Sequence, residues 1–351
     1  MVDKEDVLRA LAGVKDPELG RDLVSLRMVD GVSVAGGKVT FTLNLTTPAC
    51  PLRSRLEEAA RGAVERIPGV KEVEMKTGSS VYATRDYAQA EVLKGVKNII
   101  AVASGKGGVG KSTVAVNLAC ALAASGAKVG LLDADVYGPS IPLMMGVKSR
   151  PEVRDERVIP PVAHGVKVAS LGFFYNEETP VIWRGPLVAG AVRQLLTQVD
   201  WGELDYLVSD LPPGTGDASL TLAQTVPLGG ILIVTTPQDA ALSIAAKALA
   251  MFKRLDAPIL GVVENMSYFV CPHCGEKTEI FSGGGGKRMA AERGVDFLGE
   301  IPLAVSVREQ TDWGDPVVHS RPDSQEAMVY KELAFKVAGM LSIVAYAKMK
   351  K

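Results

Sequence analysis

The sequence predicts an α/β protein in which a mainly parallel sheet is covered by helices on both faces, preceded by a small α+β domain. From residue 96 on, short and wholly apolar runs alternate with helical segments, as is typical of strands buried on both faces of a parallel sheet. Before residue 80, apolar residues instead recur at every second position or along one helical stripe. The 351 residues suffice for two domains at about 150 residues each.

Composition narrows the functional classes. Lys and Arg number 39 against 40 Asp and Glu, so the chain lacks the positive field on which non-specific nucleic-acid binding depends. The first residues are acidic where a signal peptide is basic, and no apolar run approaches the roughly 18 to 20 residues that span a bilayer. Four cysteines are too few for a disulfide framework. We therefore expect a cytoplasmic protein with neither nucleic acid nor membrane as a partner.

Residues 1–80 are predicted to form the small domain. Asp3 is a candidate N-cap for a helix over residues 3–14. Alternating residues up to Leu45, around an Ala-Gly-Gly turn, predict a hairpin, and helical spacing follows from Leu52 to Ile67. A last strand is expected over 70–75.

Residues 81–95 are predicted to be a linker, because the stretch around them has neither kind of periodicity. The second domain then covers residues 96–351. It opens with an apolar strand at 98–103, a glycine-rich turn and a helix over 112–124. Four further strands are expected, with a helix at 240–255 before the last of them: 129–132, 206–208, 231–235 and 259–263.

A phosphate-binding loop is predicted between the first strand and helix of this domain, which makes it a P-loop NTPase. The stretch from Gly105 to Ser112 has the spacing Gly, four residues, Gly-Lys-Ser, in which backbone N–H groups and a helix N-terminus hold phosphates. Lys111 would contact the β- and γ-phosphates of ATP, and Ser112 would ligate Mg²⁺. The remaining nucleotide-binding candidates are Gly105, Lys106, Gly107, Gly108, Val109, Gly110 and Thr113.

A second acidic site favours this interpretation over a plain glycine-rich turn. Asp210 ends an apolar strand, as does the aspartate that holds Mg²⁺ in such enzymes. The loop Pro212–Asp217 follows directly and is a candidate sensor of the γ-phosphate.

Lys106 directly follows the first glycine of the loop, and this resembles the deviant Walker A ATPases, which include MinD, ParA, the nitrogenase iron protein and the arsenite-pump ATPase. The resemblance implies that Lys106 acts across a dimer on the partner's nucleotide, as an arginine finger does. A solubilising surface lysine is the alternative. The pair Asp133 and Asp135 also matches that group, with Asp135 expected to orient the attacking water and Asp133 to support Mg²⁺. The sequence does not separate the two roles.

Cys271 and Cys274 form a Cys-Pro-His-Cys-Gly turn that suits two metal-bound thiolates. Three interpretations compete. A redox pair would open a helix, but no apolar helical stripe follows. A zinc site within the chain would need two more ligands, and the three histidines lack finger spacing. A centre shared by two subunits would have four thiolates, which suit an iron–sulfur cluster, with zinc as a possible substitute.

Taken together, several motifs resemble the Mrp/ApbC family of iron–sulfur cluster carrier ATPases over residues 95–345. They are Ser104–Thr113, Asp133–Ser140, Trp183–Pro186, Asp210–Asp217, Glu264–Ser267 and the cysteine pair. The resemblance implies a homodimer with a bridging 4Fe-4S cluster, slow ATP hydrolysis, and transfer of clusters to apo-proteins alongside assembly scaffolds. It implies an adenine contact for Asn265, for which a strand-end residue is the alternative. Gly283–Gly286 resembles the family's glycine loop, and a flexible hinge is the other interpretation.

The first domain resembles the small iron–sulfur-assembly domain that is often fused ahead of these ATPases. The motifs are Asp16-Pro-Glu18 and the segment Thr47–Pro51, which contains Cys50. Cys50 precedes a helix N-terminus, which can lower a thiol pKa, so it is a candidate accessory ligand; a buried, inert cysteine is the alternative. Cys120 is expected in the core.

Two other functions remain open on the sequence. A MinD- or ParA-like switch that positions cargo is the main alternative, and its membrane helix would have to use the weakly basic end Lys348–Lys351. A scaffold for other assembly factors is the second. The cysteine pair and the N-terminal domain argue against both.

Overall fold

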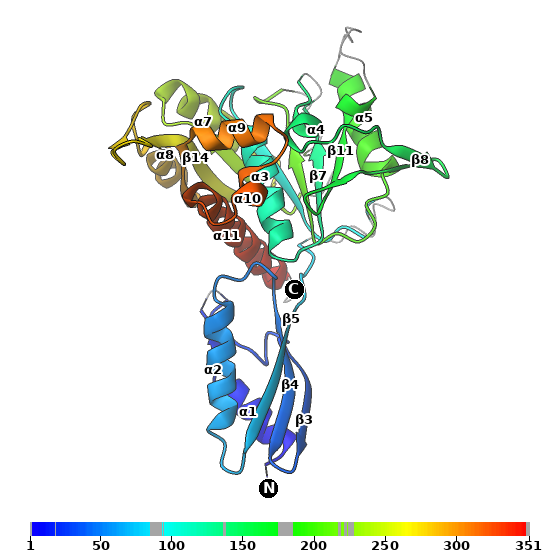
Figure 1. The fold of residues 1–351 in the computed structure, drawn as a ribbon, viewed down its shortest axis with the longest axis vertical. Coiled ribbons are helices and arrows are strands. Elements are labelled where there is room, and N and C mark those ends of the chain that lie inside the picture. The colour runs from blue at the N-terminus through cyan, green and yellow to red at the C-terminus, as the bar shows by residue number, and fades with distance from the viewer. Residues whose placement is uncertain are drawn as a thin grey trace. The chain divides into compact units, whose positions relative to one another are not determined.

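The computed structural model describes residues 2–17, 19–84, 93, 95–135, 138–174, 185–216, 219–220, 223 and 228–348. The chain forms two compact units (Figure 1). The first contains Met1–Tyr82 together with Ala338–Lys351, and the second contains Ala83–Val337.

The first unit packs two helices against a three-stranded sheet. Asp3 caps α1 through a reciprocal capping box with Asp6, as expected for an N-cap. Strands β3 and β4 form the predicted hairpin, and β5 joins β4 in parallel. Every second residue of β4 is buried, which matches its period-two pattern. The elements are α1 (Lys4–Leu11), β1 (Lys15–Asp16), β2 (Arg21–Asp22), β3 (Val29–Ala35), β4 (Lys38–Leu45), α2 (Arg53–Glu65) and β5 (Glu72–Ser79).

The end of the last helix, α11 (Gln325–Lys348), belongs to this first unit, whereas the sequence analysis grouped all of 96–351 together. Tyr346 packs against the apolar core of the first unit, and the Ser342 hydroxyl donates to the Thr46 carbonyl at 3.4 Å. These contacts join segments almost 300 residues apart in sequence, so no local sequence pattern predicts them.

The second unit is built on a nine-stranded sheet with the order β10-β11-β7-β12-β6-β13-β14-β15, in which β16 also pairs with β14. All pairs are parallel except β10–β11 and β14–β15. Every residue of β6, β7, β12 and β13 is buried, as required of strands covered on both faces. The predicted fold class is therefore confirmed. The strands are β6 (Ile99–Ser104), β7 (Val129–Asp133), β8 (Glu152–Arg154), β9 (Arg157–Ile159), β10 (Val162–Ala163), β11 (Val166–Ser170), β12 (Tyr206–Asp210), β13 (Gly230–Thr235), β14 (Ile259–Val270), β15 (Lys277–Thr278) and β16 (Phe297–Leu303).

Helices cover this sheet, and two of them position the site. Helix α3 packs against β6, β7 and β12, and α7 packs against β13 and β14. The helical segments are α3 (Lys111–Ala124), α4 (Ile141–Met144), the short 3₁₀ turn Leu171–Phe173, α5 (Gly185–Gln198), α7 (Asp239–Arg254), α8 (Gly285–Arg293), α9 (Val305–Asp312), α10 (Val317–Ser320) and α11. Across the described ranges, every helix is too short or too polar to cross a membrane.

Candidate functional site

The phosphate loop lies between the central strand β6 and helix α3, as the sequence predicts. Gly108 and Gly110 have φ values of 78° and 79°, a left-handed backbone that favours glycine. Gly105 is required for a different reason, because a Cβ atom there would lie 2.4 Å from the backbone nitrogen of Ala245 in α7. Such glycine turns present successive N–H groups to an anion at the start of a helix.

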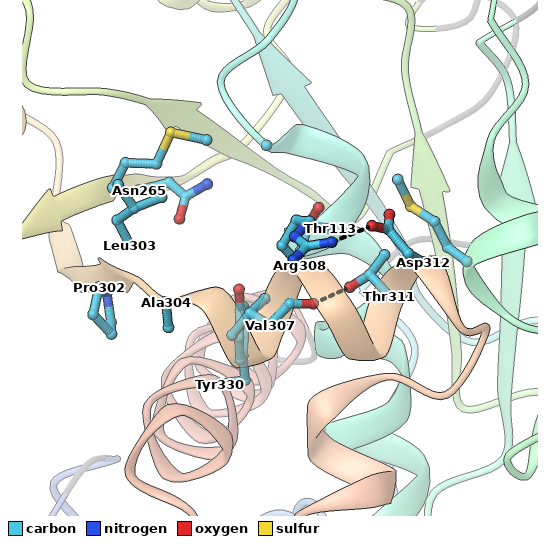
Figure 2. Close-up of a pocket in the computed structure, with 13 residues that line it drawn as sticks. Thr113, Asn265, Pro302, Leu303, Ala304, Val307, Arg308, Thr311, Asp312 and Tyr330 are labelled. Atoms are coloured by element: carbon cyan, nitrogen blue, oxygen red, sulfur yellow. Dashed lines mark hydrogen bonds and ion pairs between the residues drawn. The ribbon is translucent and has the colours of Figure 1, made fainter. Parts of the chain in front are cut away.

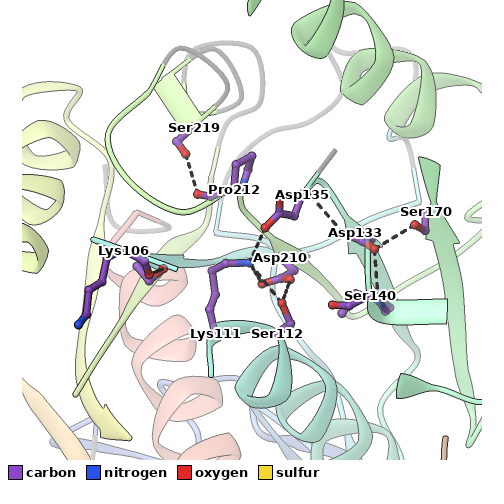
Figure 3. Close-up of polar contacts among 12 residues, drawn as sticks. Lys106, Lys111, Ser112, Asp133, Asp135, Ser140, Ser170, Asp210, Pro212 and Ser219 are labelled. Carbon is purple, nitrogen blue, oxygen red and sulfur yellow. Dashed lines mark hydrogen bonds and ion pairs between the residues drawn. The ribbon is translucent and has the colours of Figure 1, made fainter. Parts of the chain in front are cut away.

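Lys111, Ser112 and Asp210 meet at the carboxyl ends of β6 and β12 (Figure 3). The Lys111 ammonium donates to Asp210 Oδ1 at 2.6 Å, and the Ser112 hydroxyl donates to Oδ2 of the same carboxylate at 2.6 Å. Lys111 is 6% exposed and Asp210 is fully buried. The structure thus brings together the three predicted ligands of phosphate and Mg²⁺.

Asp133 is the last residue of β7, and Asp135 follows two residues later (Figure 3). Asp135 Oδ2 lies 3.7 Å from the Lys111 ammonium, so it faces the phosphate site. Asp133 points away: it accepts from the Ser170 hydroxyl at 2.9 Å and from the Ile141 amide at 3.3 Å. The two acids therefore have different surroundings, and their separate roles stay predictions.

Burial disfavours the charged form of the carboxylates at this site. It raises the pKa of Asp133 to about 7, with the Asp210 charge as the second cause, and it also raises the pKa of Asp210. Among the described residues, the one ammonium of Lys111 pairs with two carboxylates, those of Asp210 and Asp135, and the buried Asp135 Oδ1 has no hydrogen-bond partner. A divalent cation with oxygen ligands fits this combination of excess negative charge and an unpartnered oxygen.

Lys106 is placed differently from Lys111. Its side chain extends away from Lys111 and Asp210 (Figure 3), and it makes no ion pair with any described residue. Its own backbone carbonyl accepts from the Ser104 hydroxyl at 3.0 Å, which ties the loop to the end of β6. The loop after β12 also contacts the end of β6, because the Gly214 amide donates to the Ser104 carbonyl at 2.9 Å.

A pocket of about 200 Å³ opens beside the phosphate loop (Figure 2). Its walls are mainly apolar, which suits a flat aromatic ring. Asn265 lines the pocket and donates from Nδ2 to the Val109 carbonyl at 2.8 Å, so it also braces the loop. Met266, from the motif Glu264–Ser267, also lines the pocket. The rest of the wall carries no sequence motif: Met144, Pro302, Leu303, Ala304, Val307, Arg308, Thr311, Asp312 and Tyr330.

Glu264, the neighbour of Asn265 in β14, anchors the glycine loop. Its fully buried carboxylate accepts from the amides of Gly284, at 3.2 Å, and Gly286. A Cβ atom on Gly285 would lie 2.5 Å from Leu242 Cδ1. The loop is therefore held by a buried carboxylate and close packing, which argues against the hinge interpretation.

Cys271 and Cys274 lie in the turn that joins β14 to β15. The Gly275 amide donates to the Cys271 carbonyl at 2.8 Å, and Gly275 has a φ of 74°. Backbone N–H groups of Cys274 and His273 hold the pKa of the Cys271 thiol below its usual value, because they stabilise the thiolate. A hairpin turn is not the helix start that a thioredoxin-like pair requires. Within the described ranges, no third His, Cys, Asp or Glu joins the two thiols to make a ligand set.

The other two cysteines differ in their environment. Cys120 is buried in α3, which raises the pKa of its thiol to about 12, so it is a core residue as expected. Cys50 is half-buried, packs against the core of the first unit and lies three residues before Arg53, the first residue of α2. Its role as a ligand stays a prediction.

Several sequence motifs are only partly described. Glu18, the pair at 136–137, Trp183, Arg184 and Asp217 lie outside the described residues.

Two family models match the chain. Residues 95–338 match the model described as NUBPL iron-transfer P-loop NTPase. Residues 4–75 match the model described as iron-sulfur cluster assembly protein. Together they account for both units apart from the connecting stretch and the C-terminus.

Individual proteins show the same relationship. An iron-sulfur cluster carrier protein of Synechocystis is 48% identical over 351 residues, covering 98% of this chain and 99% of the relative. The solved structure of a nucleotide-binding protein from Archaeoglobus fulgidus in complex with ADP is 43% identical, with a TM-score of 0.58 over 66% of this chain and 92% of that one. The cell division ATPase MinD of Pyrococcus furiosus is 24% identical, with a TM-score of 0.53 over 68% of this chain and 98% of that one, and shares the fold alone.

Proposed function

This chain belongs to the family of iron-transfer P-loop NTPases, and we propose that it carries a 4Fe-4S cluster held between two copies of itself. In this proposal it acts in the cytoplasm, binds and slowly hydrolyses ATP, and passes the cluster from assembly scaffolds to apo-proteins. The names of its relatives support the carrier role. The shared cluster is supported by one observation on the turn of Cys271 and Cys274, called the knuckle below. Its two thiols have no further ligand beside them among the described residues.

Two thiolates are half of what a 4Fe-4S cluster needs, because each of its four irons takes one cysteine. Cys274 is exposed and Cys271 is half-buried, so both are accessible from outside the chain. The lowered pKa of Cys271 favours the thiolate, which is the form that binds iron. A second copy would present the same pair, and a two-fold axis through the cluster would complete the four ligands.

The nucleotide site supplies the ATPase. Lys111 and the loop amides would bind the phosphates, and Asp135 would orient the attacking water, because it faces the site across Lys111 at 3.7 Å. Mg²⁺, when bound, neutralises phosphate charge, and Ser112 and Asp210 would hold it. Asp133 is a positioning residue that donates no group to the site and fixes the backbone after β7. The adenine would occupy the pocket beside Asn265.

One strand connects the two sites. In β14, Asn265 contacts the phosphate loop, Glu264 holds the glycine loop, and the strand runs on to Val270, the residue before Cys271, past an irregularity at Met266, whose φ is 55°. A shift of the phosphate loop on nucleotide binding would therefore pass along β14 toward Cys271 and Cys274. Such coupling is reciprocal, so the cluster would also change nucleotide affinity.

The proposal is tested by anaerobic reconstitution of the purified chain with iron and sulfide. We expect a brown chromophore and about two irons per chain, which corresponds to one 4Fe-4S cluster per dimer. About four irons per chain, on a monomer, would contradict the shared site.

Lys106→Ala is predicted to slow hydrolysis by about 1,000-fold while ATP still binds, because a lysine that acts across the dimer stabilises the transition state. Mixing this variant with Lys111→Ala chains supplies the test. In a mixed dimer the Lys106→Ala chain binds ATP and receives an intact Lys106 from its partner, so activity should return. Failure to recover activity on mixing would exclude action across the dimer.

Cys50→Ser is predicted to leave ATP hydrolysis unchanged and to slow cluster transfer to an apo-protein, because the thiol would hold the cluster in transit. The measurement is the rate of transfer from reconstituted protein, followed through the activity of the acceptor. Cys120→Ala is the matched control, since that thiol is buried and should not affect transfer. Equal transfer rates for wild type and Cys50→Ser would leave Cys50 as a packing residue.

A further inference from the structure

Two of the three histidines in the chain meet outside the Cys271–Cys274 turn, next to one aspartate. His164 and His319 stack with their ring centroids 4.3 Å apart. His319 Nδ1 lies 2.6 Å from Asp315 Oδ1, and His164 Nδ1 lies 3.8 Å from the same oxygen. One donor atom from each residue lies within 4.8 Å of the other two, and no other set of three such residues gathers in this way in the described part of the chain.

The fold brings these residues together from segments 150 residues apart. His164 occupies the tight turn between β10 and β11, with a φ of 51°. Asp315 and His319 flank the start of α10, which packs on α3 through a hydrogen bond from the Val318 amide to Asn117 Oδ1 at 3.3 Å. Gly314 approaches Gly146 so closely that a Cβ on Gly314 would lie 2.4 Å from the Gly146 Cα. The side of the cluster that carries Asp315 and His319 is thus fixed by backbone packing.

A hydrogen bond prepares His164 to be a ligand. Its Nε2 lies 3.0 Å from the Gly314 carbonyl, and because a carbonyl only accepts, Nε2 carries the proton. Neutral His164 therefore has its lone pair on Nδ1, the atom that faces Asp315. A ring N–H bonded to a backbone carbonyl is the usual support of a metal-binding histidine.

We propose that His164, Asp315 and His319 form a second metal site, which takes a divalent first-row transition ion such as Zn²⁺. Two imidazoles and one carboxylate are ligands that such ions prefer, whereas Mg²⁺ prefers oxygen alone. Ligand atoms on a tetrahedral ion lie about 3.4 Å apart, so small side-chain rotations suffice to close the present spacing. The ion would take the place of the proton between His319 and Asp315. With Asp315 43% and His319 54% exposed, the ion would keep open coordination positions and exchange with solvent.

This metal site is separate from the iron–sulfur cluster proposed above. Its test therefore uses a chain in which both thiols of the knuckle are replaced. The untagged full-length chain with Cys271→Ser and Cys274→Ser is titrated with Zn²⁺ by calorimetry and with Co²⁺ by visible absorption. We expect one equivalent of Zn²⁺, and Co²⁺ bands without the sulfur charge-transfer absorption of a thiolate site. His164→Ala and His319→Ala in this background should each weaken zinc binding by about tenfold or more.

Two controls make the result decisive. His273→Ala in the same background should leave zinc affinity unchanged, since that histidine lies in the knuckle. Asp315→Asn keeps a hydrogen-bond acceptor for His319 but removes the ligand charge, so zinc binding should weaken while ATP affinity, which reports a folded second unit, stays the same. Absence of Zn²⁺ binding, or binding that survives loss of both His164 and His319, would contradict the proposed metal site. The three side chains would then form only a His–Asp hydrogen bond beside a second histidine.

Discussion

Lys111→Ala is expected to abolish ATP binding. Lys111 supplies the one ammonium within reach of Asp210 and Asp135 among the described residues, so its loss would set the phosphates against uncompensated carboxylates. Breaking a buried ion pair also costs about 3–5 kcal/mol of folding free energy, because Asp210 would be left without its partner. Calorimetric titration with ATP in the presence of Mg²⁺ measures the effect, and circular dichroism on heating separates it from unfolding.

Lys106→Ala is the matched control for this experiment, since it removes a lysine from the same loop that points away from Asp210 (Figure 3). It should bind ATP nearly as the wild type does. If Lys111→Ala remains folded and binds ATP with unchanged affinity, the phosphate site has been assigned to the wrong residue.

Cys271→Ser and Cys274→Ser are each expected to abolish the iron–sulfur chromophore. A single substitution removes two of the four ligands from a shared cluster, one from each copy, so the loss should be nearly complete rather than graded. ATP binding should persist, because the phosphate loop is formed by other elements. The measurements are visible absorption and iron content after anaerobic reconstitution.

Cys120→Ala is the control, because its thiol is buried in α3 and should not contribute a ligand. It should retain the full complement of iron. Full iron retention in either knuckle variant would instead place the cluster elsewhere and remove the basis of the shared site.

The parts of the site that the sequence predicts are those made by contiguous residues. The phosphate loop can be predicted because Gly108 and Gly110 have backbone conformations that favour glycine, and Lys111 follows at a fixed spacing. Asp210 is predictable because it ends a buried strand that begins with the apolar run Tyr206–Val208. The Cys-x-x-Cys turn is likewise local, and the structure places it in a hairpin connection.

Features made by distant segments are not predictable in this way. Much of the wall of the pocket beside the phosphate loop comes from α9 and the end of β16, where the sequence carries no motif. Glu264 belongs to the motif Glu264–Ser267, but its role in holding the glycine loop becomes visible only when the fold places the glycine amides against its carboxylate. The pairing of His164 with His319 depends on a turn and a short helix that lie side by side only in three dimensions.

The central claim is that two copies of this chain share one cluster through Cys271 and Cys274. Native mass spectrometry of the anaerobically reconstituted protein tests it most directly, because it reports the number of chains and the cargo of one particle together. The account predicts a particle of two chains with four irons and four sulfides, which falls apart into cluster-free single chains when the cluster is removed with a chelator. A single chain that carries an intact 4Fe-4S cluster would contradict it.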